Sequence, residues 1–90
     1  MAHRELEFRG INREHLIMYM EELGGILEPG RKPVCFQGKQ WQMEIIHEGE
    51  ITFTPVFKVN TMVIRFTADS NTLLDELIKQ FRFKTTRIGG

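Results

Sequence analysis

Few side chains in this 90-residue sequence have the types and spacing that chemistry needs. The three histidines, His3, His15 and His47, fall at a terminus, in the first turn of a predicted helix and beside a predicted turn. None stands at a metal-ligand spacing from another histidine or from Cys35, so we interpret them as solvated. The thiol of Cys35 has no activating residue beside it in the sequence, although His47 falls on a strand that could neighbour it. We therefore expect a buried, inert cysteine, with no metal ion and no other cofactor.

Paired carboxylates are the next candidates, since two of them can share general acid and base roles. Glu44 with Glu48, and Glu5 with Glu7, are spaced closely enough to be considered. On strands with this much charge, such residues usually form the hydrated face of a sheet. Gly24-Gly25 follows a predicted helix rather than preceding one, so it does not have the position of a phosphate-binding loop. The sequence shows no catalytic constellation, and we expect that the protein is not an enzyme.

The terminal Gly89-Gly90 has a more specific chemistry. Because glycine carries no side chain, an extended tail of this type can enter the channel of an activating enzyme. There its carboxylate is adenylated and then converted to a thiocarboxylate. Carriers of the ubiquitin-like type run ββαββ and reach the tail from a strand, whereas here a helix is predicted shortly before it. A sulfur carrier using Gly89 and Gly90 is one alternative, and a frayed end is the other.

Basic side chains gather towards the C-terminus, interleaved with two aromatic ones: Lys79, Arg82, Phe81, Phe83, Lys84 and Arg87. Such a strip is compatible with contacts to phosphates or RNA. It is equally compatible with cations placed favourably at the end of a helix, with the aromatic rings buried. The 12 basic and 12 acidic residues of the chain cancel, and nucleic-acid binders usually carry an excess of Lys and Arg. We therefore do not expect nucleic acid as the partner.

The composition indicates one small globular domain over residues 1–90. The 41% hydrophobic content is enough for a single core. No apolar run approaches the roughly 18 residues that a membrane helix requires. The lone cysteine suits a reducing compartment, and the first residues lack the apolar region of a secretion signal. We expect a cytoplasmic protein.

Two segments have helical periodicity. The first is predicted to begin after Asn12, whose side chain can cap it, and to run to about Leu23 before a left-handed end at Gly24-Gly25. The second is predicted to be capped by ADSNT (68–72), to carry one apolar stripe, and to fray near Arg82.

The other segments alternate between apolar and polar residues, as half-buried strands do. The predicted strands are 5–11, 34–36, 40–45, 51–58 and 62–67. HEGE (47–50) and Asn60-Thr61 are predicted turns, and Pro55 marks an edge, a bulge or a break in a strand. The aromatic side chains predicted to face the core are Trp41, Phe53, Phe57 and Phe66.

The resulting order is β-α-β-β-β-β-α, an α+β class. The economical arrangement is an antiparallel sheet of four or five strands with both helices on one face. The opposite face is then uncovered and mostly polar, with residues that include Glu5, Glu44, Thr52, Lys58 and Arg65. Apolar residues are also predicted on it, and they complete a candidate interaction face for a protein partner or a second copy of the chain: Ile46, Val56, Val63 and Arg65.

Three stretches together resemble a known family: ELEFRGINREHL (5–16), VFKVNTMVIRFTAD (56–69) and LIKQFRFKTTRIGG (77–90). They are similar to the C-terminal domain of proteins related to the small subunit of molybdopterin synthase, a domain family of unknown function. The resemblance implies a TATA-binding-protein-like half-fold, β-α-β4-α, and no particular activity. The ubiquitin-like domain that carries sulfur in larger relatives is not found in these residues, so no functional residue is transferred. We expect an interaction module accessory to molybdenum-cofactor or sulfur metabolism, with the sulfur carrier and the nucleic-acid binder as alternatives.

Overall fold

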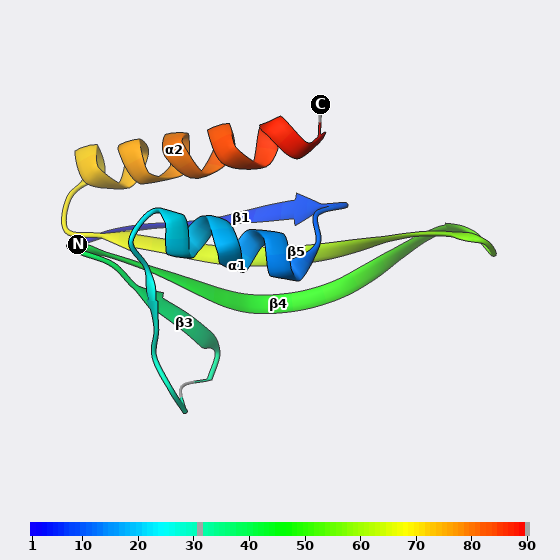
Figure 1. Cartoon of the computed structure of the whole chain (residues 1–90), viewed down its shortest axis with the longest axis horizontal. Coiled ribbons are helices and arrows are strands. Elements are labelled where there is room, and N and C mark those ends of the chain that lie inside the picture. The colour runs from blue at the N-terminus through cyan, green and yellow to red at the C-terminus, as the bar shows by residue number, and fades with distance from the viewer. Residues whose placement is uncertain (31, 90) are drawn as a thin grey trace.

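The computed structural model describes residues 1–30 and 32–89, without the side chains of residues 87–89. Its elements are β1 (Ala2–Arg9), α1 (Arg13–Glu22), β2 (Ile26–Leu27), β3 (Val34–Gln37), β4 (Trp41–Thr54), β5 (Phe57–Ala68) and α2 (Asn71–Gly89). In the described part of the chain, the strands form one five-stranded antiparallel sheet in the order β1-β5-β4-β3-β2 (Figure 1). The predicted α+β class and the predicted order of elements are confirmed.

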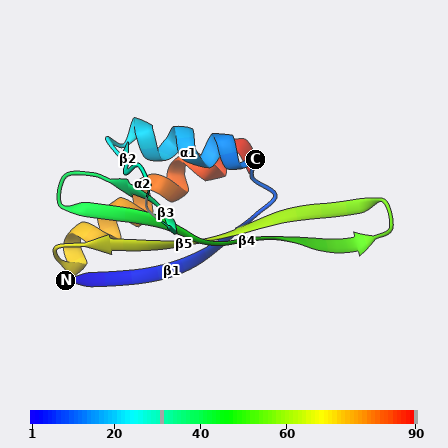
Figure 2. The ribbon, with the colours of Figure 1, turned by 90° about the horizontal axis from the view of Figure 1, so that it is seen from below.

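Both helices lie on the same face of the sheet (Figure 2), which confirms the predicted layering. We call the opposite face, which no helix covers, the outer face. The core fills the layer between sheet and helices, and its largest fully buried side chains include Leu16, Met20, Met43, Ile64 and Leu74. Three aromatic rings meet edge to face in this layer, with centroids 5.4 Å apart for Phe8 and Phe81 and 5.5 Å apart for Phe66 and Phe81. These contacts join β1, β5 and α2.

Helix α1 begins and ends as its sequence predicts. The side chain of Asn12 accepts a hydrogen bond from the backbone N–H of Glu14 at 2.7 Å. At the other end Gly24 adopts a φ of 99°, and its N–H donates to the carbonyl of Glu21 at 2.9 Å. The N–H of Gly25 donates to the carbonyl of Met20, also at 2.9 Å, which completes a Schellman motif.

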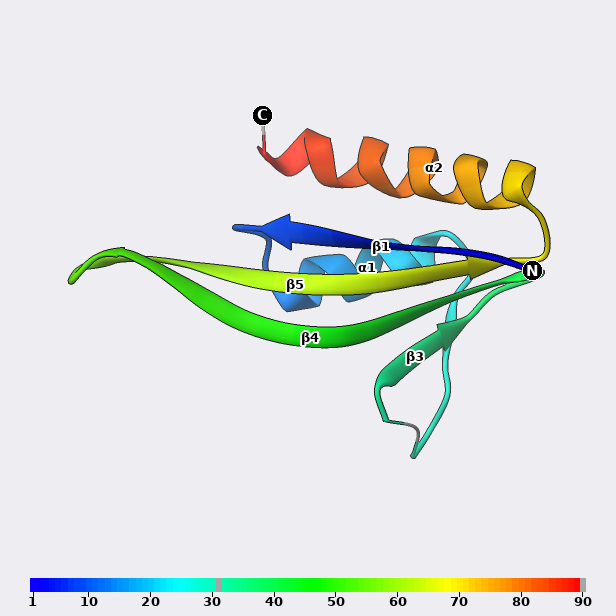
Figure 3. The same cartoon turned by 180° about the vertical axis from the view of Figure 1, so that it is seen from behind.

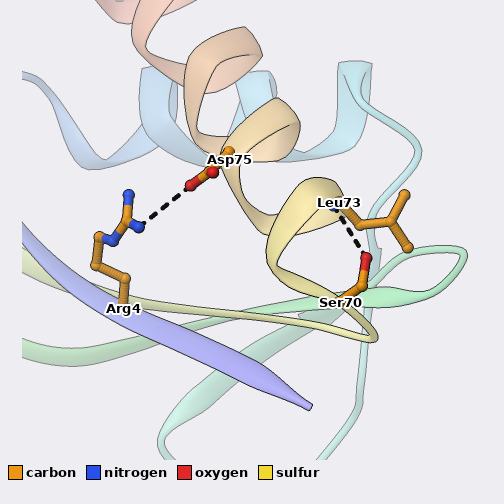
Figure 4. Close-up of polar contacts among 4 residues, drawn as sticks. All are labelled: Arg4, Ser70, Leu73 and Asp75. Atoms are coloured by element: carbon orange, nitrogen blue, oxygen red, sulfur yellow. Dashed lines mark hydrogen bonds and ion pairs between the residues drawn. The ribbon is translucent and has the colours of Figure 1, made fainter.

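The start of helix α2 is fixed by two side chains (Figure 4). The hydroxyl of Ser70 accepts a hydrogen bond from the N–H of Leu73 at 3.2 Å. The guanidinium of Arg4 in β1 lies 3.2 Å from the carboxylate of Asp75, which ties the first turns of the helix to the edge strand. The cap predicted within residues 68–72 is therefore confirmed.

The end of helix α2 lies beyond the predicted position. The sequence predicted fraying near Arg82, but the helix continues to Gly89. Lys84 explains part of the difference, because its ammonium lies 2.9 Å from the carboxylate of Glu22 in α1. Thr85 is buried, and its hydroxyl donates to the carbonyl of Arg82 at 3.1 Å. In the described part of the chain, no helix combines the length and apolar content needed to cross a membrane.

The turn between β4 and β5 also differs from the prediction. HEGE (47–50) lies inside β4 and Asn60-Thr61 lies inside β5, while the chain reverses at Pro55 and Val56. Here the hydroxyl of Thr54 accepts hydrogen bonds from the N–H of Val56 at 3.3 Å and of Phe57 at 3.0 Å. This Thr-Pro turn ends the strand, which is one of the alternatives that Pro55 left open.

The far part of this hairpin projects from the body of the protein (Figures 1 and 3). β3 pairs with β4 no further than Ile45, and β1 pairs with β5 no further than Thr61. We call residues 46–60 the hairpin arm. The arm gives the molecule its long dimension of 43 Å.

A bulge at the base of the arm exchanges the two faces of β4. Ile45 is paired with Ile64, but the next pair is His47 with Val63, so Ile46 is an extra residue. Beyond it Phe53 of β4 faces outwards, although the alternating pattern assigned it to the core. Phe57 belongs to β5, after the turn, and there it has the outward phase of Val63 and Arg65. Phe53 is 57% exposed and Phe57 is 56% exposed, so their predicted burial is wrong.

The predicted positions of four other residues can be judged in the same way. Phe66 is fully buried and Trp41 packs against the core, as predicted. Thr52 and Lys58 were both predicted on the outer face. Lys58 has the same phase along β5 as Met62, whose side chain is in the core, and Thr52 is paired with Lys58. Both residues therefore lie on the helix side of the arm.

Candidate interaction surface

A row of charges crosses the centre of the outer face. The register places Arg65 of β5 between Glu5 of β1 and Glu44 of β4. The guanidinium Nη2 of Arg65 lies 2.9 Å from Oε2 of Glu5, and its Nε donates to the same oxygen at 3.0 Å. Its Nη1 lies 3.8 Å from Oε1 of Glu44.

The burial of these charges differs across the row. The side chain of Glu44 is only 9% exposed, whereas the side chain of Arg65 is 39% exposed and that of Glu5 is 46% exposed. A planar guanidinium held on one edge by a carboxylate is fixed in orientation. The row therefore presents oriented charge that a partner can recognise.

The apolar members of the predicted interaction face do not form one patch. Val63 is half-buried on the outer face, between Glu7 on β1 and His47 on β4. Ile46 is half-buried at the bulge. Val56 is 94% exposed in the turn at the tip of the arm, which is roughly 23 Å from Val63 along an extended strand. The structure therefore places Val63 beside Arg65, and it places Val56 elsewhere.

The arm has an apolar outer side that the sequence interpretation missed. Ile51 faces Val59 across the strands, and the rings of Phe53 and Phe57 are in contact with centroids 5.6 Å apart. We call these four side chains the apolar arm face. A Thr-Pro pair flanked by two alternating runs was the signal for a hairpin centred on Pro55, and it would have placed both aromatic rings on one side of a ribbon.

The helix side of the arm is polar by contrast. Lys58 lies 3.9 Å from the carboxylate of Glu50. Nearer the body, the carboxylate of Glu48 lies 3.2 Å from the guanidinium of Arg13 at the start of α1. The arm is thus an amphipathic two-stranded ribbon whose charged side faces the helices.

The chemical candidates from the sequence are dispersed. Cys35 is fully buried opposite Glu44, while His47 is paired with Val63 on another part of the sheet. Within the described residues, no group of three or more His, Cys, Asp or Glu side chains has the arrangement needed to hold a metal ion.

The paired carboxylates are engaged in ion pairs. Besides the pairs of Glu5, Glu44 and Glu48 already described, Glu7 lies 2.7 Å from the guanidinium of Arg9. Each of these carboxylates already has a cation as its partner, an arrangement that suits surface structure better than proton transfer.

The C-terminal basic strip has mixed surroundings. Phe81 is fully buried in the core, but Phe83 is 67% exposed, so only one of the two rings is covered. Lys84 is paired with Glu22, and the side chain of Arg87 lies outside the described residues. Phe83 lines a shallow hollow between the helices, together with Leu23, Glu76, Lys79, Gln80 and Lys84. Binding of nucleic acid by this strip stays a prediction.

The candidate carrier terminus is only partly described. Gly89 is the last residue of α2, so the chain before it is helical rather than an extended tail. Gly90 lies outside the described residues. A function for the two glycines stays a prediction.

Taken together, the fold and this surface define a small α+β protein of β-α-β4-α order with one sheet face that neither helix covers. The family model described as archaeal MoaD-like protein matches residues 4–90. The chain belongs to this family, and the resemblance noted in the sequence is confirmed. No curated protein sequence and no solved structure matches the chain significantly.

Proposed function

We propose that this MoaD-like chain is a protein-binding module rather than an enzyme, and that it docks a protein of molybdenum-cofactor or sulfur metabolism on its outer face. The observation that carries the proposal is the layering, because both helices cover one face and neither covers the other, where Arg65 and Val63 remain partly exposed. A sheet face without a covering layer is a common site of association.

The centre of the outer face supports the proposal in a second way. Arg65 is held between two carboxylates, and its side chain is still 39% exposed. Val63 provides a half-buried apolar contact beside it. An apolar centre next to an oriented arginine is a frequent composition of binding hot spots.

The test is capture of partners from the native cell with the tagged chain as bait, followed by chemical cross-linking and mass spectrometry. We expect an enzyme or carrier of molybdenum-cofactor or sulfur metabolism to be cross-linked to β1 or β5. Arg65→Ala and Val63→Asp should each reduce its capture at least about tenfold, as loss of a hot spot does.

The matched control is His15→Ala, because His15 is exposed on α1, on the covered side of the sheet. Capture by this variant should equal that of the unchanged chain. Circular dichroism of all variants separates loss of binding from loss of fold. If Arg65→Ala and Val63→Asp both capture as much partner as the unchanged chain, the proposal is wrong.

A second candidate is a sulfur carrier that uses Gly90. The family match supports it, because the matched region extends through residue 90 and includes both glycines. The helical state of Gly89 adds a requirement, since the last turn of α2 has to unwind before a tail can enter an activating enzyme.

Mass spectrometry of the intact chain purified from its native cell tests the carrier. A thiocarboxylate differs from the acid by the replacement of one oxygen atom by sulfur. Detection of this form, and its loss when Gly89-Gly90 is deleted, would support the candidate. If only the free acid is found, and the deletion variant still performs the native role, the carrier is ruled out.

A further inference from the structure

We propose that the hairpin arm pairs with the arm of a second copy of this chain, β4 against β4 in antiparallel orientation, about a two-fold axis at Ile51. The inference deepens the proposed function by naming a self-association site, and it rests on that function only in treating the chain as a binding module.

The first observation is an open strand edge. β3 covers the edge of β4 only as far as Ile45, so residues 46–54 have no paired strand on that side among the described residues. Long uncovered edges are templates for pairing with another strand, and monomeric proteins usually block them. The arm carries no proline within residues 46–54 and no lysine on β4.

The second observation identifies the backbone groups that point to this edge. The carbonyl of Asn60 accepts the N–H of Gly10 at 2.8 Å, on the β1 side of β5. Asn60 therefore does not exchange hydrogen bonds with its partner Glu50 in β4. The N–H and C=O of Glu50 then point away from β5, and by alternation so do those of Glu48 and Thr52.

The third observation selects the register. A symmetric pairing centred on Glu50 would oppose two glutamates of the two copies, and one centred on Gly49 would oppose Glu48 and Glu50. Centring on Ile51 gives the longest overlap that places no two carboxylates opposite each other. It also aligns Glu50 with Thr52 of the second copy, so the outward N–H and C=O groups of both residues meet.

The same register makes the apolar arm faces continuous. Ile51 meets Ile51 of the second copy, and Phe53 lies across Gly49 of the second copy. An aromatic ring over a cross-strand glycine covers backbone that would otherwise be exposed. Phe53 is 57% exposed in the single chain, so its burial supplies an apolar contribution to pairing.

The end of β3 leaves room for the tip of the second arm. In this register Thr52 of the second copy lies beside Glu50. β4 has a second register shift between Thr52 and Thr54, so regular pairing ends there and the turn of the second copy lies towards His47 and Ile46. These residues lie just beyond the last position that β3 covers, at Ile45. The arm is therefore as long as the uncovered edge that it would fill, which favours a second copy over an unrelated strand.

The first experiment measures the mass of the whole chain by sedimentation velocity and light scattering from about 1 µM to 1 mM, a range suited to a short interface. We expect the mass to rise from 10.6 kDa to twice that value. Thr52→Pro removes an N–H that points to the free edge and should abolish the rise, while Thr52→Ala should retain it. A monomer at every concentration would overturn the proposal, and so would a dimer that is unchanged by Thr52→Pro.

The second experiment tests the register by oxidative cross-linking in a Cys35→Ala background. Ile51→Cys places two thiols opposite each other at a pair without mutual hydrogen bonds, where the Cα atoms are about 4.5 Å apart and a disulfide can form. Phe53→Cys places its thiol opposite Gly49 and should cross-link at least about tenfold more slowly. Equal rates, or faster reaction of Phe53→Cys, would overturn the register.

Failure of the self-pairing can be distinguished from failure of the proposed docking function. A chain that stays monomeric but loses its partner through Arg65→Ala retains the docking function and refutes the self-pairing. A chain that dimerises through Ile51 but captures no partner supports the self-pairing and refutes the docking function. An arm that pairs instead with a strand of another protein would appear as a cross-link from Ile51→Cys to that protein, and this also overturns the symmetric dimer.

Discussion

The ring of Trp41 lies against the backbone of two glycines. A Cβ atom built on Gly38 would come within 1.9 Å of Cε2 of Trp41, and one built on Gly25 would lie 2.9 Å from its Cη2. The N–H of Gly38 also donates to the carbonyl of Trp41 at 2.9 Å, across the turn between β3 and β4. The indole therefore closes one end of the core only because both positions lack a side chain.

Gly38→Ala should lower the free energy of unfolding by about 1–3 kcal/mol, because the indole must leave its position to make room for the methyl group. Urea denaturation followed by circular dichroism measures the change. The control is the same substitution in a Trp41→Ala background, where the clash is gone and the cost should be small. An equal cost in both backgrounds would show that the backbone, rather than the ring, resists the change.

The stability of helix α2 depends on its cap at Ser70. Its hydroxyl caps α2 through Leu73, so Ser70→Ala should reduce stability by about 1 kcal/mol. Ser70→Asp keeps an acceptor oxygen at the cap and should retain most of the stability. Thermal and urea denaturation of the three proteins at the same pH provide the comparison. A similar loss in both variants would mean that the hydroxyl contributes by another contact.

The helices were predictable from sequence because their signals are local. Asn12, Gly24 and Ser70 each act on residues within a few positions along the chain. The end of α2 was not predictable in this way. Lys84 is stabilised by Glu22, which is 62 residues away in the sequence, and a local pattern carries no record of that contact.

The number of strands and their place between the helices were predictable, but their limits were not. The predicted strand 51–58 contains the turn at Pro55 and Val56, and β2 was not predicted. Gly49 resembles a turn residue, yet it has no positive φ and lies within β4. The bulge at Ile46 depends on the register with β5, so its exchange of faces is invisible in β4 alone. For this reason Arg65, on the regular part of β5, was placed on the outer face correctly, whereas Phe53 was assigned to the core.

The whole molecule divides into a covered body and an exposed arm. Met62, Ile64 and Phe66 are almost fully buried beneath the helices, while Phe53, Val56 and Phe57 keep more than half of their exposure. Unfolding of the body has to disrupt the common core, whereas the arm can open by itself.

Amide hydrogen exchange should show this division directly. At low concentration we expect residues 62–66 to be the most protected and residues 50–58 to exchange at least about a hundredfold faster. If arms pair, protection of Glu50 and Thr52 should rise with concentration while that of residues 62–66 does not change. Uniform protection along β4 and β5 at low concentration would contradict the division.

The length of the arm can change, whereas the dimensions of the body are fixed by its core. From Asn60 to the tip, the strand pairings of the described residues join its two strands only to each other, so no pairing with the body fixes how far they extend. One residue added to each strand would turn the tip over and carry its phenylalanines to the charged side, and a second would return them. The reach of this protein can therefore be lengthened in increments of about 7 Å without disturbing its core or exchanging the chemistry at its tip.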